Sequence, residues 1–251
     1  MTNGLKLALG LTAVLVVAVG GEMLYLHHRN VVDQNMKVTR RGEYQETPLT
    51  EDQTVFLRKE RPDSLKDERT LIGKTIWVSA GGQLDYYKDS GKHVDYKHPV
   101  GVLLGAVPLV VKDVFEQVPP KTGPAVARIA GGQKHILLAF TMPKSADPNT
   151  VYATPIGNYD DGSYNFLSDE IFFYDDPHVL YKHWGPEMWS HIDKHEPVLG
   201  MSENQAMMAL GQVIYPHGDT IGDRSVGYEN NGHSVTIDFV NDKAVKITPG
   251  T

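Results

Sequence analysis

The stretch "VLGMSENQAMMALGQVIY", residues 198–215, predicts a helix of about two turns between two glycines, with a strand behind it. Ser202 is the expected N-cap, Gln205 three residues later completes a capping box, and Gly211 is expected to end the helix. Isolated helices shorter than about 12 residues are marginal in water. The rest of the chain must therefore supply an apolar surface against which this helix packs.

The chain that follows predicts such a surface. In "HSVTIDFV", residues 233–240, apolar and polar residues alternate, which is typical of a strand with one buried face. "RSVGYENNGH" and "AVKIT" predict neighbouring strands, joined by an Asn-Gly turn and a turn at Asn241-Asp242. Upstream, "PEMWSHIDKH" predicts a second short helix with Met188, Trp189 and Ile192 on one face. The expected fold class is α+β, with two helices covering an antiparallel meander.

Four segments are expected along the chain. Residues 1–28 form a transmembrane anchor or signal segment, and residues 29–70 a polar tether that partly packs on the body near residues 55–57. Residues 71–149 alternate short β-rich runs with glycine turns, which predicts a β-rich domain like an SH3 barrel. Residues 150–251 are assigned to the α+β domain with the helix pair and the antiparallel sheet.

The N-terminal stretch "LALGLTAVLVVAVGGEMLYL", residues 7–26, contains a single charge, Glu22. At 1.5 Å per residue this segment spans ~30 Å, about the thickness of the hydrocarbon core of a bilayer. One interpretation is a signal peptide cleaved near Ala18 and Gly20, and the other is an uncleaved single-pass anchor. The anchor is favoured because the apolar stretch exceeds the about 7–15 residues of a signal peptide. The expected location is the bacterial inner membrane with the body outside the cytoplasm, in the periplasm, although Arg29, Arg40 and Arg41 weigh against that orientation.

Composition excludes several function classes. The formal net charge is −7, so the surface is expected to repel phosphate backbones, and no nucleic-acid partner is predicted. The chain has no cysteine, which excludes disulfides, thiolate catalysis, cysteine zinc sites and a lipidated N-terminal cysteine. No Gly-x-Ser-x-Gly motif is present, and no cofactor is expected.

The candidate binding residues lie in two regions, residues 159–174 and 184–195. Tryptophan and other aromatic residues are enriched where protein partners dock, although Trp189 is also expected in the core. The candidates are Phe173, Tyr174, Trp184, Trp189, His191 and His195.

A metal site is the competing interpretation of the histidines. His191 and His195 are four residues apart on the predicted helix and could bind one metal ion, with a third ligand from His178, His183 or Asp175. Residue 192 is isoleucine rather than the glutamate that a zinc hydrolase of this type uses as its base. A solvated helix face is therefore the favoured interpretation, and a metal- or carboxylate-dependent hydrolase stays the alternative.

The motif "GMSENQAMMALG" followed by a meander resembles small bacterial envelope proteins of the SmpA/OmlA type, which belong to outer-membrane assembly, and the β-lactamase-inhibitor-protein fold. The residues that carry the resemblance are Gly200, Met201, Ser202, Gln205, Ala209, Leu210 and Gly211. The resemblance implies a non-catalytic module that contacts proteins. The predicted function is thus a membrane-anchored envelope protein that binds or scaffolds an envelope protein or cell-wall polymer, with an enzyme-inhibitor role as a further alternative.

Overall fold

The computed structural model describes residues 20–27, 29, 48–79, 84–119, 121, 133–211, 214–230 and 233–250. The chain divides into two units, residues 1–50 and residues 51–251. In the first unit residues 20–27 are helical, whereas residues 7–19 of the expected membrane segment lie outside the described residues. Over the described part of the chain, no helix has both the length and the apolar character needed to cross a membrane.

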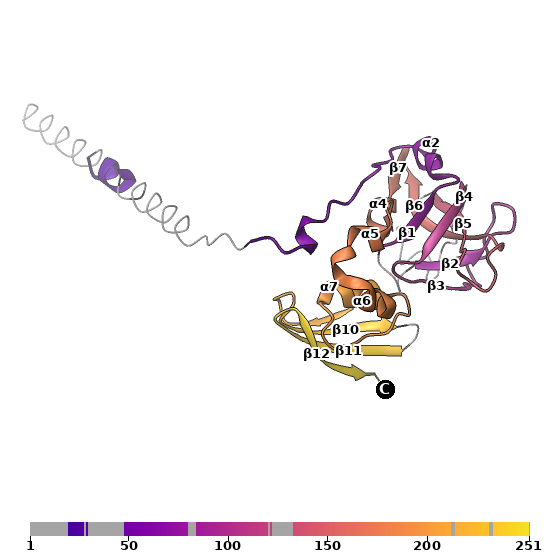
Figure 1. Ribbon diagram of the computed structural model, residues 1–251. Helices are drawn as coiled ribbons and strands as arrows, with labels where there is room; N and C mark the ends of the chain where they lie inside the picture. Colours follow the sequence, from indigo (N-terminus) through magenta and orange to yellow (C-terminus); the bar gives the residue numbers. More distant parts are fainter. Residues whose placement is uncertain are drawn as a thin grey trace, which may run out of the picture. The chain divides into compact units, whose positions relative to one another are not determined.

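The second unit contains an eight-stranded antiparallel sheet (Figure 1). Its strands are β1 (Thr75–Val78), β2 (Leu84–Lys88), β3 (Gly101–Leu103), β4 (Pro108–Gln117), β5 (Lys134–Thr141), β6 (Tyr152–Asp160), β7 (Ser163–Phe166) and β8 (Phe172–Phe173). The strand order is β3-β2-β6-β5-β4-β1-β8, and β7 pairs with β6. The hairpin between β6 and β7 turns at Asp161 and Gly162, both with positive φ.

The central strand β5 is covered on both faces, because every residue after Lys134 is buried. Ile136, Leu138 and Phe140 pack into one apolar cluster, whereas Leu137 and Ala139 pack into another. A strand covered in this way reads as a continuous apolar run, as "HILLAF" does. The eight-stranded sheet therefore has its own core on each side.

This sheet extends beyond the segment expected for it. Residues 150–174, assigned from sequence to the C-terminal domain, provide β6, β7 and β8. Strand β6 pairs with β5 along its length, and β8 pairs with β1 through Phe173 opposite Trp77. The boundary near residue 149 therefore lies inside the sheet, because the apolar run at the start of β6 is buried by strands that precede it.

The segment expected to be a polar tether also belongs in part to the second unit. Residues 51–71 contain η1 (Asp52–Thr54), α2 (Leu65–Glu68) and η2 (Arg69–Leu71). Val55 and Leu57 pack against the C-terminal core, whereas Phe56 is exposed. The expected partial packing near residues 55–57 is thus confirmed for two of the three side chains.

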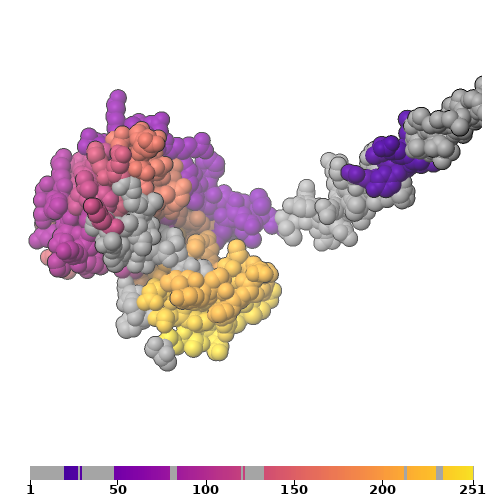
Figure 2. Space-filling model, turned by 180° about the vertical axis from the view of Figure 1, so that it is seen from behind, coloured from indigo at the N-terminus to yellow at the C-terminus, as the bar shows by residue number. Residues whose placement is uncertain are grey.

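The C-terminal part combines short helices with a second sheet, so the predicted α+β class with antiparallel sheets is confirmed. The helices are α4 (Ser168–Ile171), α5 (Pro177–Leu180), η3 (Lys182–Trp184), α6 (Gly185–Ile192) and α7 (Glu203–Leu210). The strands are β9 (Tyr215–His217), β10 (Ser225–Asn230), β11 (His233–Val240) and β12 (Lys243–Pro249), in the order β12-β11-β10-β9. Figure 2 shows the yellow C-terminal residues gathered beside the purple-to-pink residues of the larger sheet.

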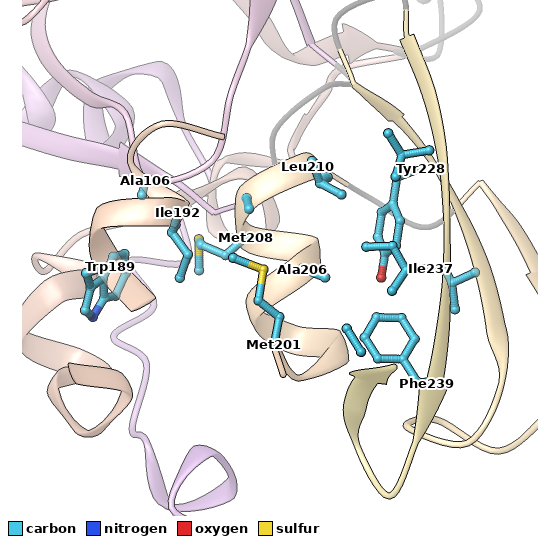
Figure 3. Close-up of a cluster of buried hydrophobic side chains, with 14 of the residues drawn as sticks. Ala106, Trp189, Ile192, Met201, Ala206, Met208, Leu210, Tyr228, Ile237 and Phe239 are labelled. Carbon is cyan, nitrogen blue, oxygen red and sulfur yellow. The ribbon is translucent and has the colours of Figure 1, made fainter. Parts of the chain in front are cut away.

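Helix α7 forms where the sequence predicts it and packs as expected. Ser202 caps it and Gln205 closes the capping box. Figure 3 shows α7 with Trp189 and Ile192 of α6 on one side and the β-sheet residues Tyr228, Ile237 and Phe239 on the other. Trp189 and Leu210 are only 6% and 1% exposed. Helix α7 packs directly on the second sheet and α6 packs on α7 (Figure 3), whereas the sequence predicted that both helices would cover the sheet.

A buried ion pair fixes the start of α7. The Glu203 carboxylate accepts hydrogen bonds from the Arg224 guanidinium and from the Gly222 backbone N–H. The side chain of Glu203 is 6% exposed and that of Arg224 14% exposed. Because both charges are largely removed from water, they depend on one another.

Candidate functional site

Four aromatic rings form a stack across α5, η3 and α6, which we call the aromatic column. Ring centroids lie 4.1 Å apart for His178 and Trp189, 5.2 Å for Trp189 and Trp184, and 4.4 Å for Trp184 and Tyr181. The order along the column is thus His178, Trp189, Trp184, Tyr181. Rings in contact at such distances add stabilisation beyond the area that they bury.

Hydrogen bonds fix the rings of the aromatic column. Trp189 Nε1 donates to the Tyr181 carbonyl oxygen at 3.1 Å, and Trp184 Nε1 donates to Asp52 Oδ1 at 2.7 Å. Asp52 also accepts from Asn204 Nδ2 at 2.8 Å and contacts His183 Nε2. The carboxylate of Asp52 therefore joins η1 to η3 and α7.

The charge of Asp52 is maintained by these donors. Burial opposes ionisation of the carboxyl, but the hydrogen bonds from Asn204, His183 and Trp184 outweigh burial and lower the pKa of Asp52. An ionised acceptor makes stronger hydrogen bonds than a neutral one. The aromatic column is thus held rigid by a charged group from the N-terminal side of the unit.

A shallow groove opens along α6 beside the aromatic column, and we call it the α6 groove. It has a volume of about 640 Å³. His178 Nε2 lies 3.1 Å from Asp193 Oδ1, and His178 Nδ1 lies 2.8 Å from Asp176 Oδ1. The lining residues are His178, Lys182, Gly185, Pro186, Trp189, Ser190, Asp193 and Lys194.

A second hollow lies on the other side of Asp193. It has a volume of about 370 Å³ and is formed by the loop between β3 and β4, the chain after β5 and the end of α6. Asp193 lines both hollows. The corner at the C-terminal end of α6 therefore separates two accessible concave surfaces.

The structure brings some of the predicted binding residues together and separates others. Trp189 and Trp184 stack in the aromatic column, with Trp189 buried and Trp184 half-buried. Phe173 and Tyr174 are 7% and 5% exposed, and they pack into two different clusters. These two side chains therefore contribute to the core instead of to a contact surface.

The predicted histidine pair does not share a helix face. Helix α6 ends at Ile192, and His195 lies beyond it with a φ of 58°. His195 Nδ1 hydrogen-bonds to the carbonyl oxygen of Ala209, whereas His191 Nδ1 lies 3.9 Å from Glu196. The spacing of four residues suggested one face only because the helix was expected to continue past residue 192.

The other metal candidates are also directed to separate partners. Both ring nitrogens of His178 face aspartates, as described above, and Asp175 lies 3.5 Å from Arg58. Within the described ranges, no group of three or more histidine, cysteine, aspartate or glutamate side chains is placed to hold a metal ion.

Two acidic residues of the expected tether have roles that the sequence did not indicate. Asp52 fixes the aromatic column, and Glu68 is 1% exposed with Oε2 at 3.2 Å from Ser168 Oγ. Glu68 Oε1 has no hydrogen-bond partner, and burial raises the pKa of this carboxyl to about 7. Both residues stand in charge-rich sequence without an apolar period, so no local signal marks them.

No protein-family model, curated protein or solved structure matches this chain. The resemblance of residues 200–211 to SmpA/OmlA-type envelope proteins therefore stays a prediction. The site itself combines a hydrogen-bonded aromatic column with two concave surfaces.

Proposed function

We propose that this protein is a membrane-anchored envelope protein that binds a protein partner through the α6 groove and catalyses no reaction. In this proposal residues 7–26 anchor the chain as a single pass in the bacterial inner membrane, with the remainder in the periplasm. The length and apolar character of residues 7–26 support the anchor. The motif at residues 200–211 and the β-rich, SH3-like pattern of residues 71–149 support an envelope binding module.

The observation that carries the proposal is the set of hydrogen bonds that orders the aromatic column. Trp189 and His178 line the α6 groove. Trp189 is held by the Tyr181 carbonyl and by the ring of Trp184, which donates to Asp52, and His178 is held by Asp176 and Asp193. Binding to side chains that are already ordered loses less conformational entropy than binding to mobile ones. A preformed aromatic surface is therefore suited to partner recognition.

The charges around the α6 groove indicate the kind of partner. Lys182 and Lys194 are exposed in its lining, whereas Asp193 is already engaged by His178. The lysines stand out on a chain whose formal net charge is −7. A protein segment with an apolar side chain flanked by carboxylates fits this arrangement, because its charges complement the lysines.

The test is site-specific photo-crosslinking of the full chain in native membranes. A photoreactive amino acid replaces Ser190, which is exposed in the α6 groove, and a matched control replaces Thr248, which is exposed on β12. We expect a discrete protein adduct from position 190 that weakens when Lys182→Glu and Lys194→Glu are combined. Equal labelling at both positions, or an adduct that cell-wall hydrolases release, would overturn the proposal of a protein partner.

A further inference from the structure

The hollow on the far side of Asp193, which we call the interlobe pocket, has the properties of a small-ligand site. It lies where the eight-stranded sheet meets the C-terminal helices, and its volume of about 370 Å³ is within the range of known ligand pockets. Its walls combine the apolar side chains of Val102, Val107 and Met142 with polar groups of Tyr86 and His195. Apart from Asp193, its lining residues differ from those of the α6 groove.

Two non-glycine residues with positive φ line this pocket. Ala106 has a φ of 60° and His195 a φ of 58°. Asparagine, aspartate and histidine adopt this conformation more often than other L-residues, so it is most unusual for Ala106. His195 follows the end of α6, where glycine is the usual residue. Residues held in such conformations cluster at functional sites, where surrounding structure enforces them.

The surrounding structure does enforce the conformation of the pocket wall. The N–H of Ala106 donates to the Val78 carbonyl oxygen at 2.8 Å, which fixes the loop to β1. The preceding Gly105 presses against α7, because a Cβ atom at this position would lie 2.1 Å from the Met208 carbonyl oxygen. The wall is therefore preformed between the sheet and α7.

The tautomer of His195 follows from its hydrogen bond. Its Nδ1 lies 3.0 Å from the Ala209 carbonyl oxygen, which can only accept, so Nδ1 carries the proton. Burial lowers the pKa of His195, and this effect exceeds the opposite effects of the Ala209 bond and of Asp193. In the neutral ring Nε2 is a hydrogen-bond acceptor.

The polar groups of the pocket differ from one wall to the other. The α6 side is lined by two residues that carry acceptors, His195 and Asp193, and the Asp193 carboxylate retains lone pairs beyond its contact with His178. On the other side Lys144 is an exposed cation. The apolar side chains of the lining complete the pocket.

We propose that the interlobe pocket binds an α-ammonium group on an aliphatic body, as in a free amino acid such as leucine or in the amino-terminal residue of a peptide. The ammonium donates to His195 Nε2 and Asp193, and the aliphatic side chain packs on Val102, Val107 and Met142. In a free amino acid the carboxylate pairs with Lys144. In a peptide the chain continues outward from the same point.

Calorimetric titration of the full chain in detergent micelles tests this assignment. The probes are L-leucine, L-leucinamide and N-acetyl-L-leucine, which separate the ammonium from the carboxylate. We expect leucine, leucinamide or both to bind. Tighter binding of leucinamide would indicate that the ligand is the amino terminus of a peptide, and tighter binding of leucine that it is a free amino acid. N-acetyl-leucine binding as tightly as leucine, or the absence of binding by all three probes at millimolar concentration, would overturn the proposal.

Variants then locate the binding in the interlobe pocket. His195→Gly removes the imidazole at a position whose backbone favours glycine, and we expect at least a tenfold loss of affinity with unchanged circular dichroism. Lys144→Gln is expected to weaken leucine more than leucinamide. Lys66→Gln, exposed on α2 and outside the pocket lining, is the matched control and keeps full affinity. Unchanged affinity in His195→Gly would contradict the assignment, whatever partner the α6 groove binds.

Discussion

The two sheets of residues 51–251 bury their strands in different ways. In the eight-stranded sheet, β5 has apolar clusters on both faces, supplied mostly by loops and strands of the same sheet, with Leu65 of α2, Leu71 of η2 and Ile171 of α4 added on one face. In the four-stranded sheet, Val235, Ile237 and Phe239 of β11 are buried on the face that α7 covers (Figure 3), while Ser234 lies exposed on the other face. The larger sheet is thus covered mostly by its own strands and loops, whereas the smaller one is covered by the eight-residue helix α7, on which the eight-residue helix α6 packs in turn.

The candidate sites lie where the eight-stranded sheet, which is covered mostly by its own strands and loops, meets the helices that cover the four-stranded sheet. The aromatic column and both hollows lie on or beside the helices that cover the smaller sheet. Elements with fewer internal contacts open more easily, and such elements commonly carry binding functions. Substitutions in α7 should therefore lower the local stability of the C-terminal sheet more than that of the eight-stranded sheet.

The largest effect is expected from breaking the ion pair at the start of α7. Glu203→Ala leaves Arg224 without its partner and the Gly222 N–H without an acceptor. Removing one member of a buried pair destabilises by about 3–5 kcal/mol. Denaturant unfolding followed by tryptophan fluorescence should report this loss, because Trp184 and Trp189 lie on the neighbouring helices. A loss below about 1 kcal/mol, the value of a surface pair, would contradict this account.

The next effect is pH-dependent and arises in the segment that precedes the eight-stranded sheet. Burial raises the pKa of Glu68 from an ordinary value of 4.5 to about 7. The stability that the protonated Glu68 carboxyl contributes is therefore complete below pH 4.5 and is lost as the pH rises through 7. At one pKa unit per 1.36 kcal/mol, Glu68→Gln should recover up to about 3 kcal/mol at pH 8. The same variant should be nearly neutral at pH 4.

Unfolding free energies at pH 4 and pH 8 check this expectation. Glu229→Gln, at an exposed position of β10, is the control. The change in unfolding free energy that it causes should be the same at both pH values. If Glu68→Gln changed stability equally at both, the Glu68 carboxyl would not be the titrating group.

A smaller effect is expected from the cap of α7. Ser202→Ala removes the side chain that accepts from the Gln205 N–H, and loss of such a cap costs about 1 kcal/mol. Ser202→Thr keeps a hydroxyl at the cap and should cost less than half as much. Melting temperatures of the two variants distinguish the cap from a general effect of altering this position, which would lower both equally.

The smallest effect is expected at the surface of the larger sheet. Lys134 Nζ lies 2.8 Å from Glu116 Oε2, but the Lys134 side chain is 42% exposed. Exposed pairs contribute about 0–1 kcal/mol, so Lys134→Ala should leave the unfolding free energy within that range. A loss as large as that of Glu203→Ala would show that solvent exposure does not determine how much each of the two ion pairs stabilises the fold.

The features predicted correctly from sequence depend on residues close together in the chain. The capping box of α7 spans four residues, and the alternation in β11 appears within eight. The turn at Asn241 likewise depends on local backbone preference.

The features that the sequence did not indicate depend on contacts between distant residues. Strand β8 pairs with β1, and Asp52 reaches Trp184 across 132 positions. The end of α6 was misplaced because His195 occupies the left-handed position that glycine normally marks. Beyond that end, His195 is tied to α7 through its hydrogen bond to the Ala209 carbonyl oxygen.

Amide hydrogen exchange of the wild-type chain and of Glu203→Ala tests most directly whether the C-terminal sheet depends on its helices. We expect the amides of β10, β11 and β12 to exchange through an opening of lower free energy than those of β5 and β6. Glu203→Ala should accelerate exchange in β10–β12 and leave β5 and β6 protected. Equal protection of both sheets in the wild type, or equal acceleration of both in the variant, would contradict the account.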